Sequence, residues 1–170
     1  MYDPDDFEVD LPYEAHRNPT PPMQWMDDQW RQGNSARTKT TARRLGEQEL
    51  REAMALTAGM ITMVDDEVGR LIEVLKDTGQ HDNTVICFNS DHGDYLGDFS
   101  LLLKGAIPFR SVTDVPMIWS DPTSREGRVT DALASTIDLS ATILDRAGLA
   151  PYNGIQGQSF MPVIEGADRH

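Results

Sequence analysis

Apolar residues recur at steps of three and four from Glu47 onward, which is the period of an amphipathic helix. The stripe consists of Leu50, Met54, Ile61, Val64, Val68, Leu71, Ile72 and Leu75. Gly79, after Lys76-Asp77-Thr78, supplies the left-handed backbone position at which helices commonly end. The pattern therefore predicts one long helix that begins at Glu47 and ends just before Gly79.

Two short apolar runs predict strands. Residues 84–88 (Thr-Val-Ile-Cys-Phe) are unbroken, rich in β-branched side chains and preceded by the turn formers Asp82 and Asn83. This run predicts a central strand buried on both faces. Residues 115–119 (Val-Pro-Met-Ile-Trp) predict a second strand, in which Pro116 removes one donor and favours the first residues or an edge.

Two further helices follow the second strand. One is predicted to end at Gly148, and its periodic positions are Ile137, Leu139, Ile143, Leu144 and Ala147. The other is short, with Ser159 placed to cap its start and Gly166 at its end. Helix, strand, strand and helix in this order predict an α/β fold with helices on the faces of a sheet.

The first 46 residues differ from the rest of the chain. They are acidic and interrupted by Pro4, Pro12, Pro19, Pro21 and Pro22, and they carry no helical or strand period. Met23, Trp25, Met26 and Trp30 nevertheless give this segment apolar anchors. We therefore expect residues 1–46 to form an extended arm lying across a larger body, and residues 47–170 to form the α/β domain.

Composition narrows the classes of partner and compartment. The 170 residues carry a formal charge of −13, which repels phosphate backbones and argues against nucleic acid. Neither an apolar window long enough for a membrane span nor a signal peptide is visible. The single cysteine, Cys87, cannot form an internal disulfide, so cysteine usage does not distinguish a cytoplasmic from a periplasmic protein.

The candidate chemistry follows the first strand directly, in Asn89-Ser90-Asp91-His92-Gly93-Asp94. The carboxylate of Asp91 and the imidazole of His92, followed by a flexible glycine, can both point at one divalent cation. Two ligands do not complete a coordination shell. The alternative is that Asp91 and Asp94 are turn formers and that His92 is hydrogen-bonded within the loop.

The stretch from Asn83 to Asp98 (NTVICFNSDHGDYLGD), then Lys104, then Val115-Pro116, resembles the second signature region of the sulfatases and phosphonate monoester hydrolases of the alkaline phosphatase superfamily. The flanks agree in order: residues 63–71, 77–79, 137–148 and 157–162 are similar to the helices and the glycine-serine-proline segment of that family. The resemblance implies an alkaline-phosphatase-like sheet with helices on both faces.

The resemblance also implies roles for individual residues. Asp91 and His92 match two metal ligands, with calcium, manganese or another divalent ion as the cofactor. Lys104 matches the lysine that contacts the oxygens of the transferred group, in a sulfate ester or a phosphate or phosphonate ester. These three residues are the candidate site.

The family's nucleophile has no match in this sequence. It is a formylglycine made within a Cys/Ser-x-Pro-Ser-Arg motif, whereas Cys87 reads as a core hydrophobe. The chain therefore resembles a C-terminal fragment with the N-terminal half missing, where the formylglycine is expected. We expect the isolated chain to be inactive and to self-associate through uncovered apolar surface. The alternative is a non-catalytic sulfatase-like binding or interaction module.

Overall fold

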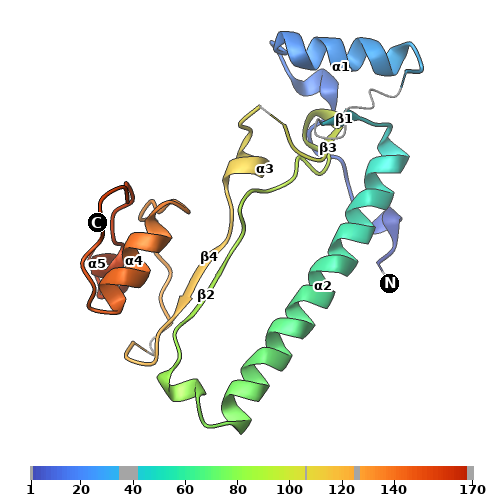
Figure 1. The fold of residues 1–170 in the computed structure, drawn as a ribbon. Coiled ribbons are helices and arrows are strands. Elements are labelled where there is room, and N and C mark those ends of the chain that lie inside the picture. The colour runs from blue at the N-terminus through green and yellow to red at the C-terminus, as the bar shows by residue number, and fades with distance from the viewer. Residues whose placement is uncertain (1, 35–41, 106, 125–126, 168–170) are drawn as a thin grey trace. The chain divides into compact units, whose positions relative to one another are not determined.

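The computed structural model describes residues 2–34, 42–105, 107–124 and 127–167. Contacts divide the chain into two compact units. The first unit contains residues 1–74 and 92–115, and the second unit contains residues 75–91 and 116–170. Both contain helices and a small two-stranded sheet, so the α/β prediction is confirmed (Figure 1).

The long helix predicted from the apolar period is present. Helix α2 spans Glu47–Asp77, 31 residues without a break (Figure 1). The side chain of Glu49 accepts a hydrogen bond from the Gly46 N–H at 3.0 Å, which satisfies one of the donors left at a helix start. Gly79 follows the helix with φ of 68°, as predicted. No helix in the described ranges is both long and apolar enough to cross a membrane.

Part of the apolar surface of α2 is exposed. Leu50 of the predicted stripe is buried and Ile61, Val64 and Leu71 are exposed, whereas its other residues are half-buried. The large apolar side chains exposed on α2 are Leu56, Met60, Ile61, Met63, Val64, Leu71 and Val74. Exposed apolar side chains gathered along one helix predict an association face.

We expect the 170-residue chain to self-associate through this face, with a second copy covering it. Light scattering should report a mass that rises with concentration, and Leu71→Gln should shift the equilibrium toward monomer. Lys76→Gln introduces the same side chain at an exposed polar position of α2 and should leave the equilibrium unchanged. A monomer at high concentration with little binding of a hydrophobic dye would contradict this expectation.

The first unit contains a helix that the sequence pattern did not reveal. Helix α1 spans Pro21–Arg31, inside the segment predicted to be extended. Pro21 and Pro22 lie in its first turn. Backbone N–H groups in that turn have no intrahelical acceptor, so proline loses no hydrogen bond there. The prolines therefore begin this helix, although a run of prolines in sequence is typical of an irregular segment.

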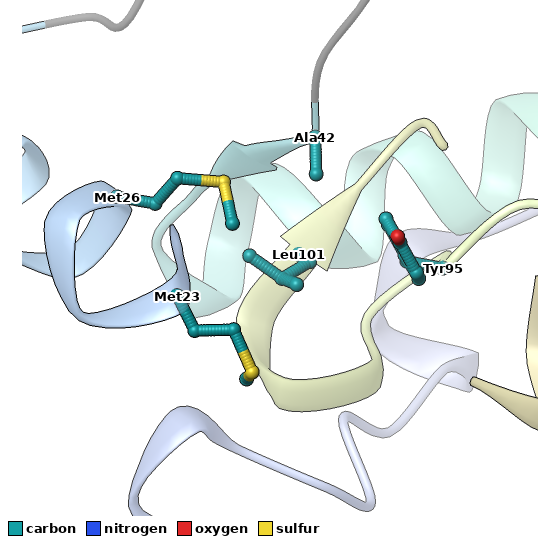
Figure 2. Packing of buried hydrophobic residues seen from close by; sticks show 5 residues of the cluster. All are labelled: Met23, Met26, Ala42, Tyr95 and Leu101. Carbon is teal, nitrogen blue, oxygen red and sulfur yellow. The ribbon is translucent and has the colours of Figure 1, made fainter. Parts of the chain in front are cut away.

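The core of the first unit joins α1 to a two-stranded antiparallel sheet. Strand β1 (Arg43–Arg44) pairs with strand β3 (Leu101–Leu102). Met23 and Met26 of α1 point toward Leu101 of β3, with Tyr95 and Ala42 nearby (Figure 2). Leu101 and Met23 are fully buried, and Tyr95 is 1% exposed. The two methionines thus anchor the N-terminal segment, as their apolar character suggested.

The N-terminal segment packs on Phe99, Ser100 and Phe109 of its own unit. The Tyr13 N–H donates to the Ser100 hydroxyl at 3.0 Å, and the His16 ring lies edge-on to Phe99 with a centroid separation of 4.7 Å. Trp30 stacks beneath the Arg44 guanidinium at 4.3 Å, whereas Trp25 is 51% exposed. The described part of the arm therefore covers a loop of this chain.

The second unit contains the two strands and two helices that the sequence predicted after α2. Strand β2 (Ile86–Asn89) pairs antiparallel with strand β4 (Met117–Ser120), and Pro116 immediately precedes β4 (Figure 1). Helix α4 spans Asp138–Arg146, and Gly148 follows it with φ of 70°. Helix α5 spans Met161–Ile164; the Ser159 hydroxyl accepts from the Met161 N–H at 3.2 Å near its start. The remaining helix, α3, is a single turn over Arg110–Thr113 in the first unit.

The prediction that the first strand is buried on both faces is wrong for this chain. Cys87 and Trp119 are register partners on the face that carries α4 and α5, where Trp119 contacts Phe160 edge-on. Their neighbours Phe88 and Ile118 point the other way and are 37% and 58% exposed. The chain returns to β4 without a long crossover helix, so the pair is antiparallel and only one of its faces is covered within the second unit.

A buried ion pair ties α4 to the end of β4. The side chain of Asp121 is 1% exposed and accepts from Arg146 through both guanidinium Nε, at 2.5 Å, and Nη2, at 3.0 Å. The hydrogen bonds from Arg146 lower the pKa of Asp121 far below its ordinary value, against the opposing effect of burial. The charged carboxylate therefore stabilises the second unit.

The stability of the chain should depend on pH through this pair. Because the folded pKa of Asp121 is depressed, its contribution is complete above the ordinary carboxyl pKa and is lost as the pH falls toward the folded value. In denaturant titrations from about pH 5 to about pH 2, the parent should lose more stability than Asp121→Asn, which has no carboxylate to protonate. Equal losses in the two proteins would contradict this assignment.

Candidate functional site

Asp91 and His92 lie in the loop directly after β2, which ends at Asn89. Asp91 is exposed and is the last residue before the chain leaves the second unit, whereas His92 is half-buried and begins the later segment of the first unit. The predicted position beyond a strand end is thus observed. That the two side chains converge on one cation stays a prediction.

Gly93 brings the His92 loop against the backbone of residues 111–112. Its N–H donates to the Val112 carbonyl at 2.8 Å. A Cβ atom at Gly93 would lie 1.9 Å from the Ser111 carbonyl oxygen, a separation that no side chain can occupy. Only glycine permits this approach.

The hydrogen bonds of His92 fix which ring nitrogen carries a lone pair. His92 Nδ1 lies 2.8 Å from the Gly93 carbonyl oxygen, and a carbonyl can only accept, so Nδ1 holds the proton. In the neutral ring the lone pair is then on Nε2. Lys104 Nζ lies 2.5 Å from that Nε2 and donates to it. The structure therefore brings together two of the three candidate residues, which are 12 positions apart in sequence.

The alternative interpretation of the loop is also partly realised. Asp94 accepts a hydrogen bond from the Leu96 N–H at 2.8 Å, two residues on, as a turn-forming aspartate does. His92 is hydrogen-bonded within the loop through Gly93. These local contacts are compatible with a chemical role, because a ligand histidine is commonly oriented by a bond from its other ring nitrogen.

A complete metal shell is not formed by the described residues: among them no group of three or more His, Cys, Asp or Glu side chains is placed to hold a metal ion. The one imidazole in the loop has the form that a metal ligand needs, with its Nδ1 proton on a backbone carbonyl and its lone pair on Nε2. His92 therefore fits a divalent cation as one ligand of a larger set, with the cation taking the place of the Lys104 N–H at Nε2.

Cys87 lines an apolar cavity in the second unit. The cavity has a volume of about 400 Å³ and is bordered by Val85, Cys87, Trp119, Ile143, Arg146 and Ala147. Burial raises the pKa of the Cys87 thiol, which disfavours the nucleophilic thiolate. Cys87 is thus a half-buried side chain whose thiol is not activated as a nucleophile.

Sequence reasoning missed Tyr95 and saw Asp94 only as a turn former. Both residues make hydrogen bonds across the loop to the segment that carries Lys104. Asp94 had a usable signal, since an aspartate just after a candidate site is a common backbone acceptor. Tyr95 had none, because its partner lies 12 residues away.

Comparison with known proteins places this chain in a family. The sulfatase family model matches residues 12–149. The chain is 36% identical over 125 residues to a multifunctional alkaline phosphatase superfamily protein, PehA, of Trinickia caryophylli, covering 71% of this chain and 24% of the relative. It is 33% identical over 125 residues to an arylsulfatase of Clostridium perfringens, covering 71% of this chain and 26% of that protein.

Solved structures agree with the sequence comparisons. The phosphonate monoester hydrolase of Agrobacterium radiobacter superposes with a TM-score of 0.67 at 36% identity, over 71% of this chain and 24% of that one. The chain belongs to the sulfatase family, within the alkaline phosphatase superfamily. It spans about a quarter of the length of these relatives. Members of the family generally use a divalent metal ion.

Proposed function

We propose that this chain supplies one side of the active site of a metal-dependent hydrolase of sulfuric esters or of related phosphonate and phosphate esters. In this proposal Asp91 and His92 are metal ligands and Lys104 contacts the oxygens of the transferred group. The observation that carries the proposal is that Lys104 and His92, 12 residues apart in sequence, lie at one place in the first unit. A cation bound at His92 Nε2 would replace the Lys104 hydrogen bond there and leave the ammonium beside it. Membership of the sulfatase family supports the reaction class.

The chemistry of Lys104 suits such an ester. Its ammonium has three N–H donors, and the one that faces His92 Nε2 would be released when a cation binds that nitrogen. The donors can then bond to non-bridging oxygens, where negative charge accumulates as the ester bond breaks. A bound divalent cation would add further charge stabilisation at the same oxygens. Lys104 is exposed, so an ester can reach it from solvent.

The nucleophile is proposed to come from residues outside this sequence. The 170 residues contain no Cys/Ser-x-Pro-Ser-Arg motif in which a formylglycine could be made. Because the nucleophile and most of a metal shell are lacking, we expect the isolated chain to bind metal weakly and to hydrolyse no aryl sulfate or phosphonate ester at a useful rate. Robust turnover that is abolished by Asp91→Ala would overturn this part of the proposal.

The proposed function is tested by a graft. The matched segment of the Clostridium perfringens arylsulfatase is replaced by the corresponding residues of this chain, and turnover is measured on an aryl sulfate and on an aryl phosphonate monoester. If the proposal holds, the folded graft turns over one of these esters with added divalent metal, and Asp91→Ala or His92→Ala abolishes turnover.

A non-catalytic module is the alternative function. Such a module would keep the scaffold of the family without its reaction. A graft that folds, binds the ester and turns over neither substrate would support this alternative and contradict the hydrolase.

A further inference from the structure

We infer that Asp94 and Tyr95 are positioning residues that clamp the backbone on both sides of Lys104 and so hold its ammonium against His92. The inference rests on the proposed function in one respect only: the proposed reaction explains why a positioned ammonium would be useful. Its structural part concerns contacts within the first unit and stands independently of the reaction. Neither residue was among the candidate site residues from sequence.

Asp94 holds the residue before Lys104. Its Oδ1 accepts two backbone hydrogen bonds, from the Leu96 N–H at 2.8 Å and from the Leu103 N–H at 3.0 Å. Leu96 and Leu103 have φ of 40° and 70°, in the left-handed region that leucine rarely adopts. A single carboxylate oxygen thus bonds both strained residues, and strained backbone persists only where the surroundings determine it.

Tyr95 holds the same segment from both ends. Its backbone N–H donates to the Leu103 carbonyl at 2.8 Å. Its hydroxyl donates to the Ile107 carbonyl at 2.9 Å and accepts from the Ile107 N–H at 3.2 Å. The backbone of Leu103 and Ile107 is therefore fixed on either side of Lys104.

The Tyr95 ring is itself immobilised by packing. It is 1% exposed, lies beside Leu101 and Ala42 (Figure 2), and meets the Phe109 ring edge-on at a centroid separation of 5.8 Å. A Cβ atom at Gly105 would lie 3.3 Å from its hydroxyl, so the turn after Lys104 rests directly on this side chain. The core described above thus supports the clamp.

The clamp has a purpose if Lys104 acts on an ester. A lysine on an exposed loop samples many conformations, and a charge placed in advance stabilises a transition state better than one that must be ordered. The structure holds the backbone at Leu103 and at Ile107, on either side of Lys104. The clamp therefore restricts the position from which the Lys104 side chain extends.

The test measures the contact itself in the isotopically labelled 170-residue chain. In the parent, nuclear Overhauser effects should connect the Lys104 ε-methylene protons with the His92 ring protons, and the Leu103 amide should exchange slowly with solvent. Asp94→Ala should weaken the Overhauser effects and speed Leu103 exchange about tenfold or more, because the side-chain oxygen that accepts from the Leu103 N–H is lost. Asp94→Asn keeps an oxygen that accepts both N–H groups and should retain parent behaviour.

Two further variants make the test decisive. Asp98→Ala removes a carboxylate of the same loop that makes no hydrogen bond to the described residues, and it should change neither readout. Tyr95→Phe keeps the ring in the core and should speed Ile107 amide exchange about fivefold to tenfold while weakening the Overhauser effects. Parent-like spectra in both Asp94→Ala and Tyr95→Phe would overturn the clamp, and so would equal losses in Asp94→Ala and Asp94→Asn.

The same variants in the grafted enzyme separate this inference from the proposed function. With an active graft, Asp94→Ala should lower kcat about tenfold or more with a smaller change in KM, and Asp94→Asn should restore most of the loss. An inactive graft would contradict the hydrolase, whereas the spectra of the 170-residue chain would still confirm or overturn the clamp.

Discussion

Lys104→Ala in the grafted, complete enzyme is expected to lower kcat/KM by about 10²- to 10³-fold, the scale of losing one preorganised donor to a developing charge. The reason is that Lys104 already lies in contact with His92, on a segment whose backbone is fixed on both sides. Steady-state kinetics on the ester that the graft hydrolyses would measure the effect. Stability should change by no more than about 0.5 kcal/mol, because the side chain is exposed.

The matched control for this prediction is Lys76→Ala. Lys76 is an exposed lysine in the last turn of α2, and its loss should leave turnover within about threefold of the parent, since surface substitutions cost little. If Lys104→Ala also stays within about threefold, on a scale where one donor is worth about 10²-fold, Lys104 does not contact the ester. The proposal would then depend on Asp91 and His92 alone.

Gly93→Ala is expected to destabilise the first unit by about 2 to 3 kcal/mol, at the upper end of the cost of overpacking. The new methyl group would meet the Ser111 carbonyl carbon at 3.0 Å as well as its oxygen at 1.9 Å. Both contacts are with backbone, which cannot rotate away. Chemical denaturation would measure the loss, and the contact between Lys104 and His92 should weaken with it.

Gly69→Ala is the control for the glycine substitution. Gly69 lies inside α2 with nothing within 4 Å of a Cβ atom, so alanine fits there without strain. Alanine should stabilise the helix by about 0.5 to 1 kcal/mol, because glycine loses more conformational freedom on folding. If Gly93→Ala were as stable as the parent, the close approach at Ser111 would not be a feature of the folded protein.

The helices and strands after residue 46 were predictable because each leaves a local period in the sequence. The stripe from Leu50 to Leu75 and the glycine that follows predicted a helix from Glu47 to just before Gly79, and the observed α2 spans Glu47–Asp77. The run around Cys87 and the one around Ile118 each give a strand within two residues of its observed limits. Helix α1 escaped prediction because its first turn is made of prolines, whose usual effect in sequence is to interrupt a period.

The candidate site was predictable only through the resemblance of its motif. Asp91 and His92 are adjacent in the sequence, but no local pattern indicates that Lys104, 12 residues after His92, contacts it. Leu96 and Leu103 have left-handed backbones that no propensity for leucine suggests. These conformations exist because Asp94 bonds to both amides, a contact that depends on the closed loop.

The sequence by itself determined the α/β class, the position and ends of α2, the two strands, and the residue types able to bind a cation and an ester oxygen. Local periodicity and side-chain chemistry are sufficient for these, since neighbouring residues decide them. The tertiary structure alone decided that β2 and β4 pair antiparallel, that α1 and the proline-rich segment pack on residues 95–101, and that Lys104 meets His92. Each of these depends on contacts between residues distant in sequence, whose free energy is set by burial and backbone hydrogen bonding in the closed fold.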